Sequence, residues 1–191
     1  MDTSKPATGV SSTTTTAPSK EPMLKNKAGR LTKLGKASMA ENGKPQIVDV
    51  LTDFGSKRRS ITDFDGKPKV LGFWASWCGP CVYEKPIFRS MANKYPNINF
   101  LSISIDKDIG DAQQFYHDRR IEVNDNDFWI GDSDRNKLKW YTMKPIEGGN
   151  GQAVTIRLPA YVLISADGTI INNDLPHPST GQMEQYLNRL Q

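Results

Sequence analysis

The strongest constraint in this chain is the segment Phe73–Cys81, FWASWCGPC, which contains the only two cysteines of the 191 residues. An apolar run precedes the cysteines and residues at helical spacing follow them, which predicts a dithiol at the junction of a buried strand and a helix. Pro80 suits the first turn of such a helix, where its missing N–H costs no hydrogen bond. The N–H groups of a helix N-terminus stabilise a thiolate, which is the reactive form of cysteine. The segment therefore predicts thiol-disulfide chemistry, with Cys78 as the attacking sulfur and Cys81 as the sheltered resolving sulfur.

Two other uses of the cysteine pair are disfavoured. A structural zinc site needs four ligands, and the chain adds only His117 and His177 as nitrogen donors, so no metal is expected. A structural disulfide between residues three positions apart closes a very short loop and stabilises the fold little. The Cys78–Cys81 pair is thus expected to be a redox-active disulfide that works without a further cofactor.

Hydrophobic spacing predicts the elements around this segment. In chain order they are a hairpin with strands over 47–51 and 58–61, a buried strand over 70–74, a helix from the cysteines to about 95, a buried strand over 98–105, a helix over 108–119, a short strand over 128–130, a helix over 133–141, a hairpin with strands over 161–164 and 169–171, and a last helix over 179–190. The alternation of strand and helix implies parallel strands joined by a right-handed crossover. Ser179 and Gln182 are predicted to form a capping box on the last helix.

The region 122–152 carries two further predictions. Its glycines at 148, 149 and 151 indicate a loop rather than a phosphate cradle, because no strand precedes them and no helix follows. Three of its aromatic residues either pack in the core, which is the favoured interpretation, or line a protein-binding groove near the dithiol. They are Trp129, Trp140 and Tyr141.

Charge and composition divide the chain at residue 46. Residues 1–45 carry eight Lys or Arg against three Asp or Glu, whereas residues 46–191 carry seventeen against eighteen, so the net charge of +4 comes from the first segment. That segment is rich in Thr, Ser, Lys and Pro, and we expect a disordered stretch or linker over 1–45. The remainder lacks a net basic charge, so nucleic-acid binding is not expected.

Three further stretches agree with FWASWCGPC: CVYEKP at 81–86, LPAYVLI at 158–164 and SADGTI at 165–170. Together they resemble the thioredoxin-like superfamily, and within it the TlpA/ResA-like thiol-disulfide oxidoreductases. The resemblance covers residues 46–191 and implies an α/β thioredoxin-like domain. Such a domain has a central mixed sheet flanked by helices, with an added N-terminal β-hairpin.

The resemblance also implies a function and a site. It implies a protein thiol-disulfide oxidoreductase, and the Gly79–Pro80 dipeptide favours a reductase. The Leu158–Pro159 bond is expected to be cis and to lie against the dithiol, where the Leu158 backbone would meet an incoming peptide strand. The residues expected to bind substrate are Trp77, Gly79, Pro80, Leu158 and Pro159. The alternatives are a disulfide oxidase or isomerase, or a non-catalytic binding or metal-carrying module of the same fold.

One position departs from the thioredoxin pattern. Thioredoxins place a buried acid six residues before the first cysteine, and this chain has Gly72 there. Glu84 is one helical turn after Cys81, so it is the candidate that handles the proton of the resolving thiol and completes a catalytic set of Cys78, Cys81 and Glu84. A solvent-exposed helix glutamate is the other interpretation, and position alone favours neither.

Partners and location are also expected by analogy. The expected partners are protein disulfide or dithiol substrates and an upstream redox protein that returns electrons to the pair. The sequence has neither an apolar run long enough to span a membrane nor the apolar core of a signal peptide. A periplasmic or extracytoplasmic monomer, tethered through a missing N-terminal segment, is favoured over a cytoplasmic protein because similar proteins work outside the cytoplasm.

Overall fold

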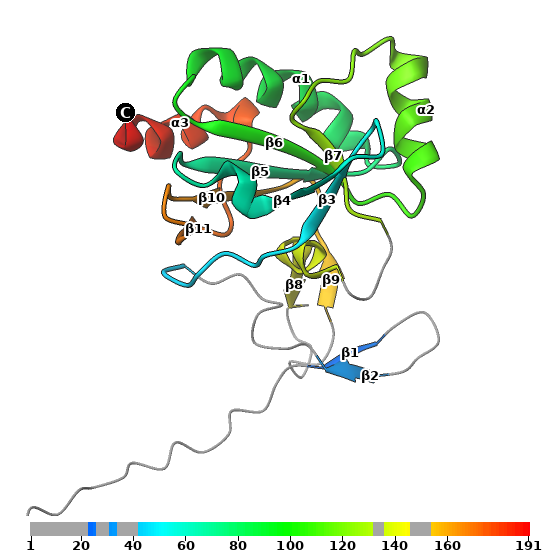
Figure 1. Ribbon diagram of the computed structural model, residues 1–191, viewed down its shortest axis with the longest axis horizontal. Coiled ribbons are helices and arrows are strands. Elements are labelled where there is room, and N and C mark those ends of the chain that lie inside the picture. The colour runs from blue at the N-terminus through cyan, green and yellow to red at the C-terminus, as the bar shows by residue number, and fades with distance from the viewer. Residues whose placement is uncertain (1–22, 26–30, 34–41, 132–135, 146–153) are drawn as a thin grey trace, which may run out of the picture.

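A mixed sheet of seven strands forms the centre of the protein in the computed structural model, which describes residues 23–25, 31–33, 42–131, 136–145 and 154–191 (Figure 1). The order across this sheet is β11-β10-β5-β6-β7-β3-β4. Strands β5, β6 and β7 run parallel, and the other neighbours pair antiparallel. The strands are β3 (Val50–Asp53), β4 (Arg58–Ser60), β5 (Lys69–Trp74), β6 (Asn99–Ser104), β7 (Asp127–Trp129), β10 (Ala160–Ile164) and β11 (Ile170–Asn172).

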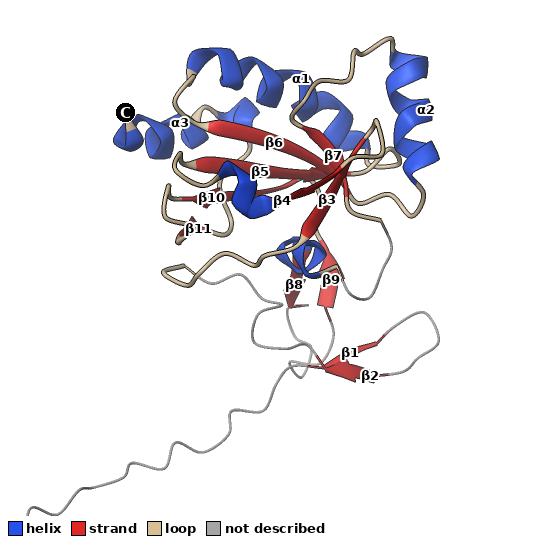
Figure 2. Ribbon diagram, viewed as in Figure 1, coloured by secondary structure: helices blue, strands red, loops and turns tan. Residues whose placement is uncertain are grey.

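Helices flank this sheet, as Figure 2 shows. The α-helices are α1 (Gly79–Lys94), α2 (Ile109–Arg119) and α3 (Gln182–Leu187), and the 3₁₀ helices are η2 (Ile61–Phe64), η3 (Lys137–Thr142), η4 (Pro178–Thr180) and η5 (Asn188–Leu190). The predicted architecture, a mixed sheet flanked by helices with an N-terminal hairpin (β3 and β4) added, is confirmed.

The core has two parts because successive residues of a strand point to opposite faces. In β10, Tyr161 and Leu163 pack in one hydrophobic cluster with α1 and α3, whereas Val162 and Ile164 pack in the other. The second cluster also contains both cysteines and residues of α2 and η3. The disulfide is therefore part of the same core as α2 and η3.

Two small antiparallel pairs lie outside the main sheet. Strand β8 (Met143–Pro145) pairs with β9 (Val154–Ile156), and β1 (Met23–Lys25) pairs with β2 (Leu31–Lys33). The linker prediction for residues 1–45 does not anticipate the β1–β2 pair. The last residues of that segment already join the domain, because the Gly43 N–H bonds to the Ile170 carbonyl and Pro45 bridges to Thr169.

Several local predictions are wrong in detail. The first hairpin strand begins at Val50 rather than 47, and the helix predicted over 133–141 is the 3₁₀ helix η3, with residues 133–135 outside the described part. The capping box of Ser179 and Gln182 does not form, because Ser179 lies in η4 and bonds to Glu84. Helix α3 begins after Gly181 without a side-chain cap. The glycine loop at 148–151 lies outside the described residues.

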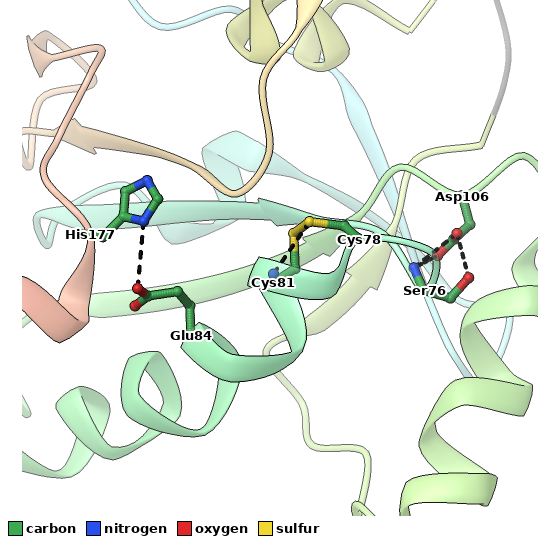
Figure 3. Close-up of a disulfide and its surroundings, with 6 residues drawn as sticks. All are labelled: Ser76, Cys78, Cys81, Glu84, Asp106 and His177. Atoms are coloured by element: carbon green, nitrogen blue, oxygen red, sulfur yellow. Dashed lines mark hydrogen bonds and ion pairs between the residues drawn. A yellow bond between two sulfur atoms is a disulfide. The ribbon is translucent and has the colours of Figure 1, made fainter.

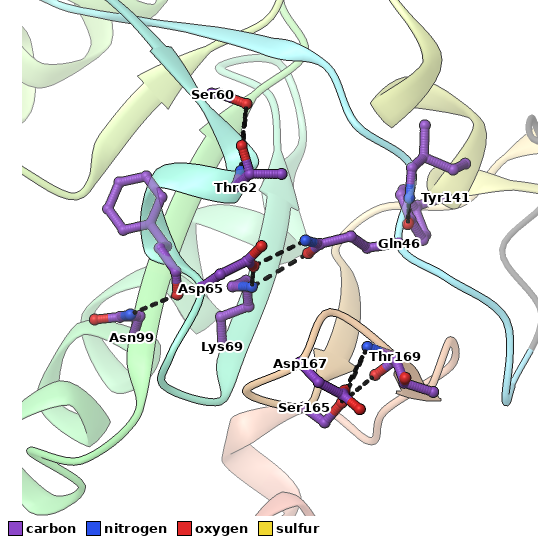
Figure 4. A network of polar contacts seen from close by, with 12 residues as sticks. Gln46, Ser60, Thr62, Asp65, Lys69, Asn99, Tyr141, Ser165, Asp167 and Thr169 are labelled. Carbon is purple, nitrogen blue, oxygen red and sulfur yellow. Dashed lines mark hydrogen bonds and ion pairs between the residues drawn. The ribbon is translucent and has the colours of Figure 1, made fainter.

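The start of β5 is anchored by a buried lysine (Figure 4). Lys69 is fully buried and its ammonium contacts the carboxylate of Asp65 and, at 3.2 Å, the amide oxygen of Gln46. The Gln46 amide also donates to Asp65 at 2.8 Å. Partial burial opposes ionisation of Asp65, but the hydrogen bonds from Lys69 and Gln46 hold its pKa below the usual value. This cluster joins the start of the domain to the turn before β5.

Gly72, in the middle of β5, lies directly under the Phe88 ring of α1. A Cβ added at Gly72 would stand 2.8 Å from Cζ of Phe88, which is closer than side-chain atoms normally approach. The ring cannot easily withdraw, because it packs against Phe100 and Tyr161 with centroid distances of 5.4 and 5.3 Å. The position that carries an acid in thioredoxins is therefore filled here by a neighbouring aromatic ring.

We expect Gly72→Ala to lower the free energy of unfolding by about 1–3 kcal/mol, because the added methyl group overpacks a buried contact. Denaturant unfolding of the oxidised protein measures the change. Gly79→Ala is the matched control, since a Cβ there meets no heavy atom within 4 Å, and we expect its effect to stay below about 1 kcal/mol. Equal destabilisation by the two substitutions would contradict the packing argument.

Candidate active site

The two cysteines form a disulfide at the N-terminus of α1, as Figure 3 shows. Strand β5 ends at Trp74, and four residues later Cys78 occupies the N-cap position of α1. The Cys78 sulfur accepts the backbone N–H of Cys81 at 3.3 Å, and Pro80 lies in the first helical turn. An N-terminal N–H group thus points at the Cys78 sulfur, where it would stabilise a thiolate.

The surroundings of the disulfide differ between its two ends. Cys81 is 1% exposed and Cys78 is 6% exposed. Exposed residues lie beside Cys78 in the sequence, namely Trp77, Gly79 and Pro80. This arrangement agrees with an outer, attacking Cys78 and an inner, resolving Cys81, while the substrate-binding role of the three exposed residues stays a prediction.

Tyr83 is a surface aromatic residue that the sequence analysis missed. Tyr83 is 67% exposed and Trp77 is 66% exposed, and both lie within five residues of Cys78 in the sequence. Its position on the helix was the available indication, because Tyr83 falls outside the buried face that Phe88 and Met91 form. Two large apolar side chains therefore stand in solvent near the disulfide.

The loop before Cys78 is held by a buried carboxylate. Asp106 is fully buried and follows β6, and its two oxygens each accept the Ser76 N–H at 3.0 Å. The Ser76 hydroxyl donates to the same carboxylate at 2.8 Å and the Ser104 hydroxyl at 2.7 Å. The Trp129 indole N–H donates to the Asp106 carbonyl at 2.9 Å. Asp106 thereby fixes the loop that delivers Cys78, a role that its place at the end of a strand did not reveal.

Glu84 is buried rather than solvent-exposed, yet its carboxylate does not contact the disulfide. It accepts the backbone N–H of Ser179 at 3.0 Å and the Ser179 hydroxyl, and it lies 3.5 Å from Nδ1 of His177. Figure 3 shows the carboxylate directed toward His177. Its contacts join α1 to η4, so the interpretation as a solvent-exposed glutamate is wrong. A role in moving the Cys81 proton stays a prediction.

The segment before β10 passes close to the inner cysteine. The Leu158–Pro159 peptide bond is cis, and Pro159 is buried and lines a small cavity together with Cys81. Leu158 is half-buried and packs against the core cluster that contains both cysteines. The structure thus brings Pro159 to the dithiol, and the binding of a peptide strand by the Leu158 backbone stays a prediction.

Of Trp129, Trp140 and Tyr141, the last belongs to the core. Its ring stacks on Phe73 at 5.9 Å, and its hydroxyl accepts the Ile47 N–H at 2.8 Å. Burial raises the pKa of Tyr141 to about 12, so it stays neutral near pH 7. Trp129 and Trp140 are half-buried, and the Trp129 indole supports the Asp106 loop.

Neither a metal site nor a membrane helix is found within the described residues. No three side chains among His, Cys, Asp and Glu lie together in a way that would hold a metal ion there. Across the same residues, no helix has the length and apolarity that crossing a bilayer requires.

Comparison with known proteins places the dithiol in a family context. Residues 39–190 match the family model described as Redoxin. Among curated proteins, the thiol-disulfide oxidoreductase ResA of Bacillus thuringiensis subsp. konkukian is 29% identical over 161 residues, covering 81% of this chain and 82% of the relative.

Solved structures agree with this match. A candidate thiol-disulfide oxidoreductase from Bacteroides vulgatus superposes with a TM-score of 0.65 and 25% identity, over 79% of this chain and 97% of that chain. A secreted disulfide oxidoreductase from Mycobacterium tuberculosis gives a TM-score of 0.52 and 25% identity, over 74% of this chain and 96% of that chain. The predicted thioredoxin-like fold is thus confirmed.

We expect Asp106→Asn to slow the attack of reduced Cys78 on a small chromogenic disulfide by roughly tenfold or more, because an amide cannot accept all the donors that now hold the loop. Stopped-flow measurement of the first thiol released reports this step. Asp167→Asn is the matched control, because Asp167 also accepts a serine hydroxyl and a backbone N–H but lies in the β10–β11 turn. If the two variants react at the same rate, Asp106 does not position the loop.

Proposed function

Because this chain belongs to the Redoxin family and is a thiol-disulfide oxidoreductase, we propose that it reduces disulfide bonds in other proteins. The observation that carries this proposal is the geometry of the disulfide at the start of α1. The Cys78 sulfur is the outer one and accepts a helix N-terminal N–H, whereas Cys81 is buried. A thiolate on Cys78 is therefore stabilised by the helix, and the second thiol is held in reserve.

The reaction follows from these positions. In the reduced protein the Cys78 thiolate attacks a substrate disulfide, forming a mixed disulfide and releasing one substrate thiolate. Cys81 then attacks the Cys78 sulfur, the mixed disulfide breaks, and the second substrate sulfur leaves with the electron pair. The substrate gains two electrons, and Cys78–Cys81 is left oxidised, which is the state seen in the structure.

Protein substrates fit the surface around Cys78. Trp77 and Tyr83 present exposed aromatic side chains near the disulfide, and such side chains are enriched where proteins contact other proteins. Gly79 has no side chain at the exposed start of α1, so a substrate chain can approach the sulfur. The Leu158 backbone beside Pro159 would align an extended substrate strand.

The direction of electron flow and the partner belong to the same proposal. The Gly79–Pro80 dipeptide, shared with thioredoxins, supports a reductant rather than an oxidant. A reductant with a single dithiol must be re-reduced after each turnover, so an upstream redox protein is implied. We propose that the chain acts as a monomer on protein partners and does not bind nucleic acid.

We place this activity outside the cytoplasm. The Mycobacterium tuberculosis protein of the same fold is described as secreted, and 25% of its aligned residues are identical to this chain. The Thr- and Ser-rich first segment suits a stalk between a membrane anchor and the domain. A periplasmic or extracytoplasmic position, tethered through the N-terminal side, is the arrangement that we favour.

The reduction potential of the Cys78–Cys81 pair tests the proposed direction. We expect a value near or below about −230 mV after equilibration in defined thiol-disulfide buffers, followed by trapping of free thiols. Cys78→Ser is the control, because it removes the outer sulfur and must abolish the two-electron transition. A potential of about −120 to −180 mV would instead identify an oxidase or isomerase.

The absence of a reversible transition would refute the enzyme assignment and favour a binding or metal-carrying module. Copper titration followed by dialysis separates those two outcomes. Stoichiometric retention of copper that His177→Ala abolishes identifies a carrier, and no retention leaves a binding module.

A further inference from the structure

A buried lysine lies behind the inner cysteine. Lys85 is 4% exposed, and its ammonium donates to the Ser102 hydroxyl at 2.6 Å. The ammonium also lies 3.9 Å from the centre of the Trp74 ring and 4.8 Å from that of Tyr116. Its carboxylate partner is Asp127, at 3.4 Å, which is a long distance for the ion pair of a lysine buried to this degree.

The carboxylate nearest to Lys85 is largely satisfied by other groups. Asp127 accepts the Tyr116 hydroxyl at 2.8 Å, the Asn124 N–H at 2.9 Å and the Arg89 guanidinium at 3.1 Å, but lies 3.4 Å from Lys85. Lys85 therefore has the longest of these four contacts. Burial lowers the pKa of Lys85, the Asp127 charge partly opposes this effect and the Arg89 charge adds to it, so the pKa is about 8.

Lys85 and Cys81 face the same small cavity. They are four residues apart on α1, so their side chains lie on one face of the helix. The cavity measures about 10 Å³, on the order of the volume that one water molecule occupies, and Gly72, Ser102 and Pro159 also line it. Gly72 leaves no room for an acid here, so Lys85 and Tyr161 are the ionisable side chains that line this cavity with the inner sulfur.

We propose that Lys85 shares one proton with the Cys81 thiol in the reduced enzyme and so supplies the Cys81 thiolate that resolves the mixed disulfide. Only the part of this proposal that concerns turnover, the resolution of the mixed disulfide, rests on the proposed function. The two side chains line one cavity of the fold, so their coupling can be measured without turnover.

Cys81 and Lys85 together hold one proton when the mixed disulfide is resolved. Once the pair has lost its first proton to solvent, the remaining proton lies either on Cys81, beside a neutral Lys85 amine, or on Lys85, beside a Cys81 thiolate. In the second arrangement the thiolate attacks the Cys78 sulfur. The bond between Cys78 and the substrate sulfur breaks, and the substrate leaves as a thiolate that takes a proton from solvent. Lys85 stays protonated while the disulfide is present. When the disulfide is next reduced, Cys81 becomes protonated again.

The other charged or titratable groups around this pair come from four elements. They are Arg89 on α1, Tyr116 on α2, Asp127 on β7 and Tyr161 on β10. Burial raises the pKa values of both tyrosines far above their usual range, so neither titrates near neutral pH. Asp127 and Arg89 pair with each other at 3.1 Å, which leaves Lys85 as the group that responds to the charge on Cys81.

The test uses Cys78→Ser, in which Cys81 is the sole thiol, and follows its thiolate absorbance against pH. Adding Lys85→Met should raise the pKa of Cys81, with a thiolate fraction about tenfold lower at a given pH below that pKa, because a neighbouring positive charge favours the thiolate. Lys69→Met is the matched control, since it also replaces a buried lysine, and should leave the pKa of Cys81 unchanged. An unchanged pKa in the folded Lys85→Met protein overturns the proposal.

Glu84→Gln in the same background tests the rival proton acceptor. If Glu84→Gln alters the pKa of Cys81 and Lys85→Met does not, the proton belongs to Glu84 and our proposal is wrong.

A reciprocal measurement keeps Lys85 intact and therefore does not depend on the folding of its variants. By linkage, the pKa of Lys85, followed by NMR of its side chain, should be higher in Cys78→Ser than in the protein that also carries Cys81→Ser.

The consequence for turnover is measured separately. With both cysteines present, a chromogenic disulfide releases one thiol when Cys78 attacks and a second when Cys81 resolves the adduct. Lys85→Met should slow the second release about tenfold near pH 7 and leave the first nearly unchanged. Equal slowing of both releases contradicts the proposal. A protein that shows the coupled pKa values but fails to reduce protein disulfides would refute the proposed function alone.

Discussion

The close packing of α1 on the central sheet is the constraint on which the redox site depends. Gly72 allows the Phe88 ring to approach the backbone of β5, so the helix lies directly over the strand that precedes it. In this position of α1, Cys78 caps the N-terminus of the helix, next to exposed residues, and Cys81 and Lys85 face inward. One small residue therefore permits the close packing that positions the start of α1.

The site separates its chemistry into an apolar outer part and a polar inner part. Outside, the aromatic side chains of Trp77 and Tyr83 and the start of α1 are exposed to solvent. Inside, Asp106 fixes the loop before the first cysteine, and Lys85 with Asp127 places charges behind the second. Buried charges interact more strongly than exposed ones because water screens them less, so a few residues can set the behaviour of both sulfurs.

The sequence was sufficient for the parts of the fold that follow from local pattern. Apolar runs predicted β5, β6 and β10, and the cysteine spacing predicted the start of α1, because these features depend on neighbours in the chain. Ser179 fitted a capping box by spacing, yet it bonds to Glu84, which is 95 residues away. The contacts of Asp106 and Lys85 lack a local pattern for the same reason, since Ser76 and Ser102 reach them only through folding. Long-range polar contacts have no local pattern that reveals them.

Strand β7 touches both inner networks at once. Trp129 donates to the Asp106 carbonyl before the first cysteine, and Asp127, two residues earlier, lies beside the lysine behind the second. On its other side β7 pairs with β3, through Thr52 and Asp53. Without the β3–β4 hairpin, β7 would be an edge strand with unpaired backbone groups, free to fray or to pair with another chain. The β3–β4 hairpin thus holds β7 in place. Through Trp129 and Asp127, β7 in turn contacts the residues that lie next to the two cysteines.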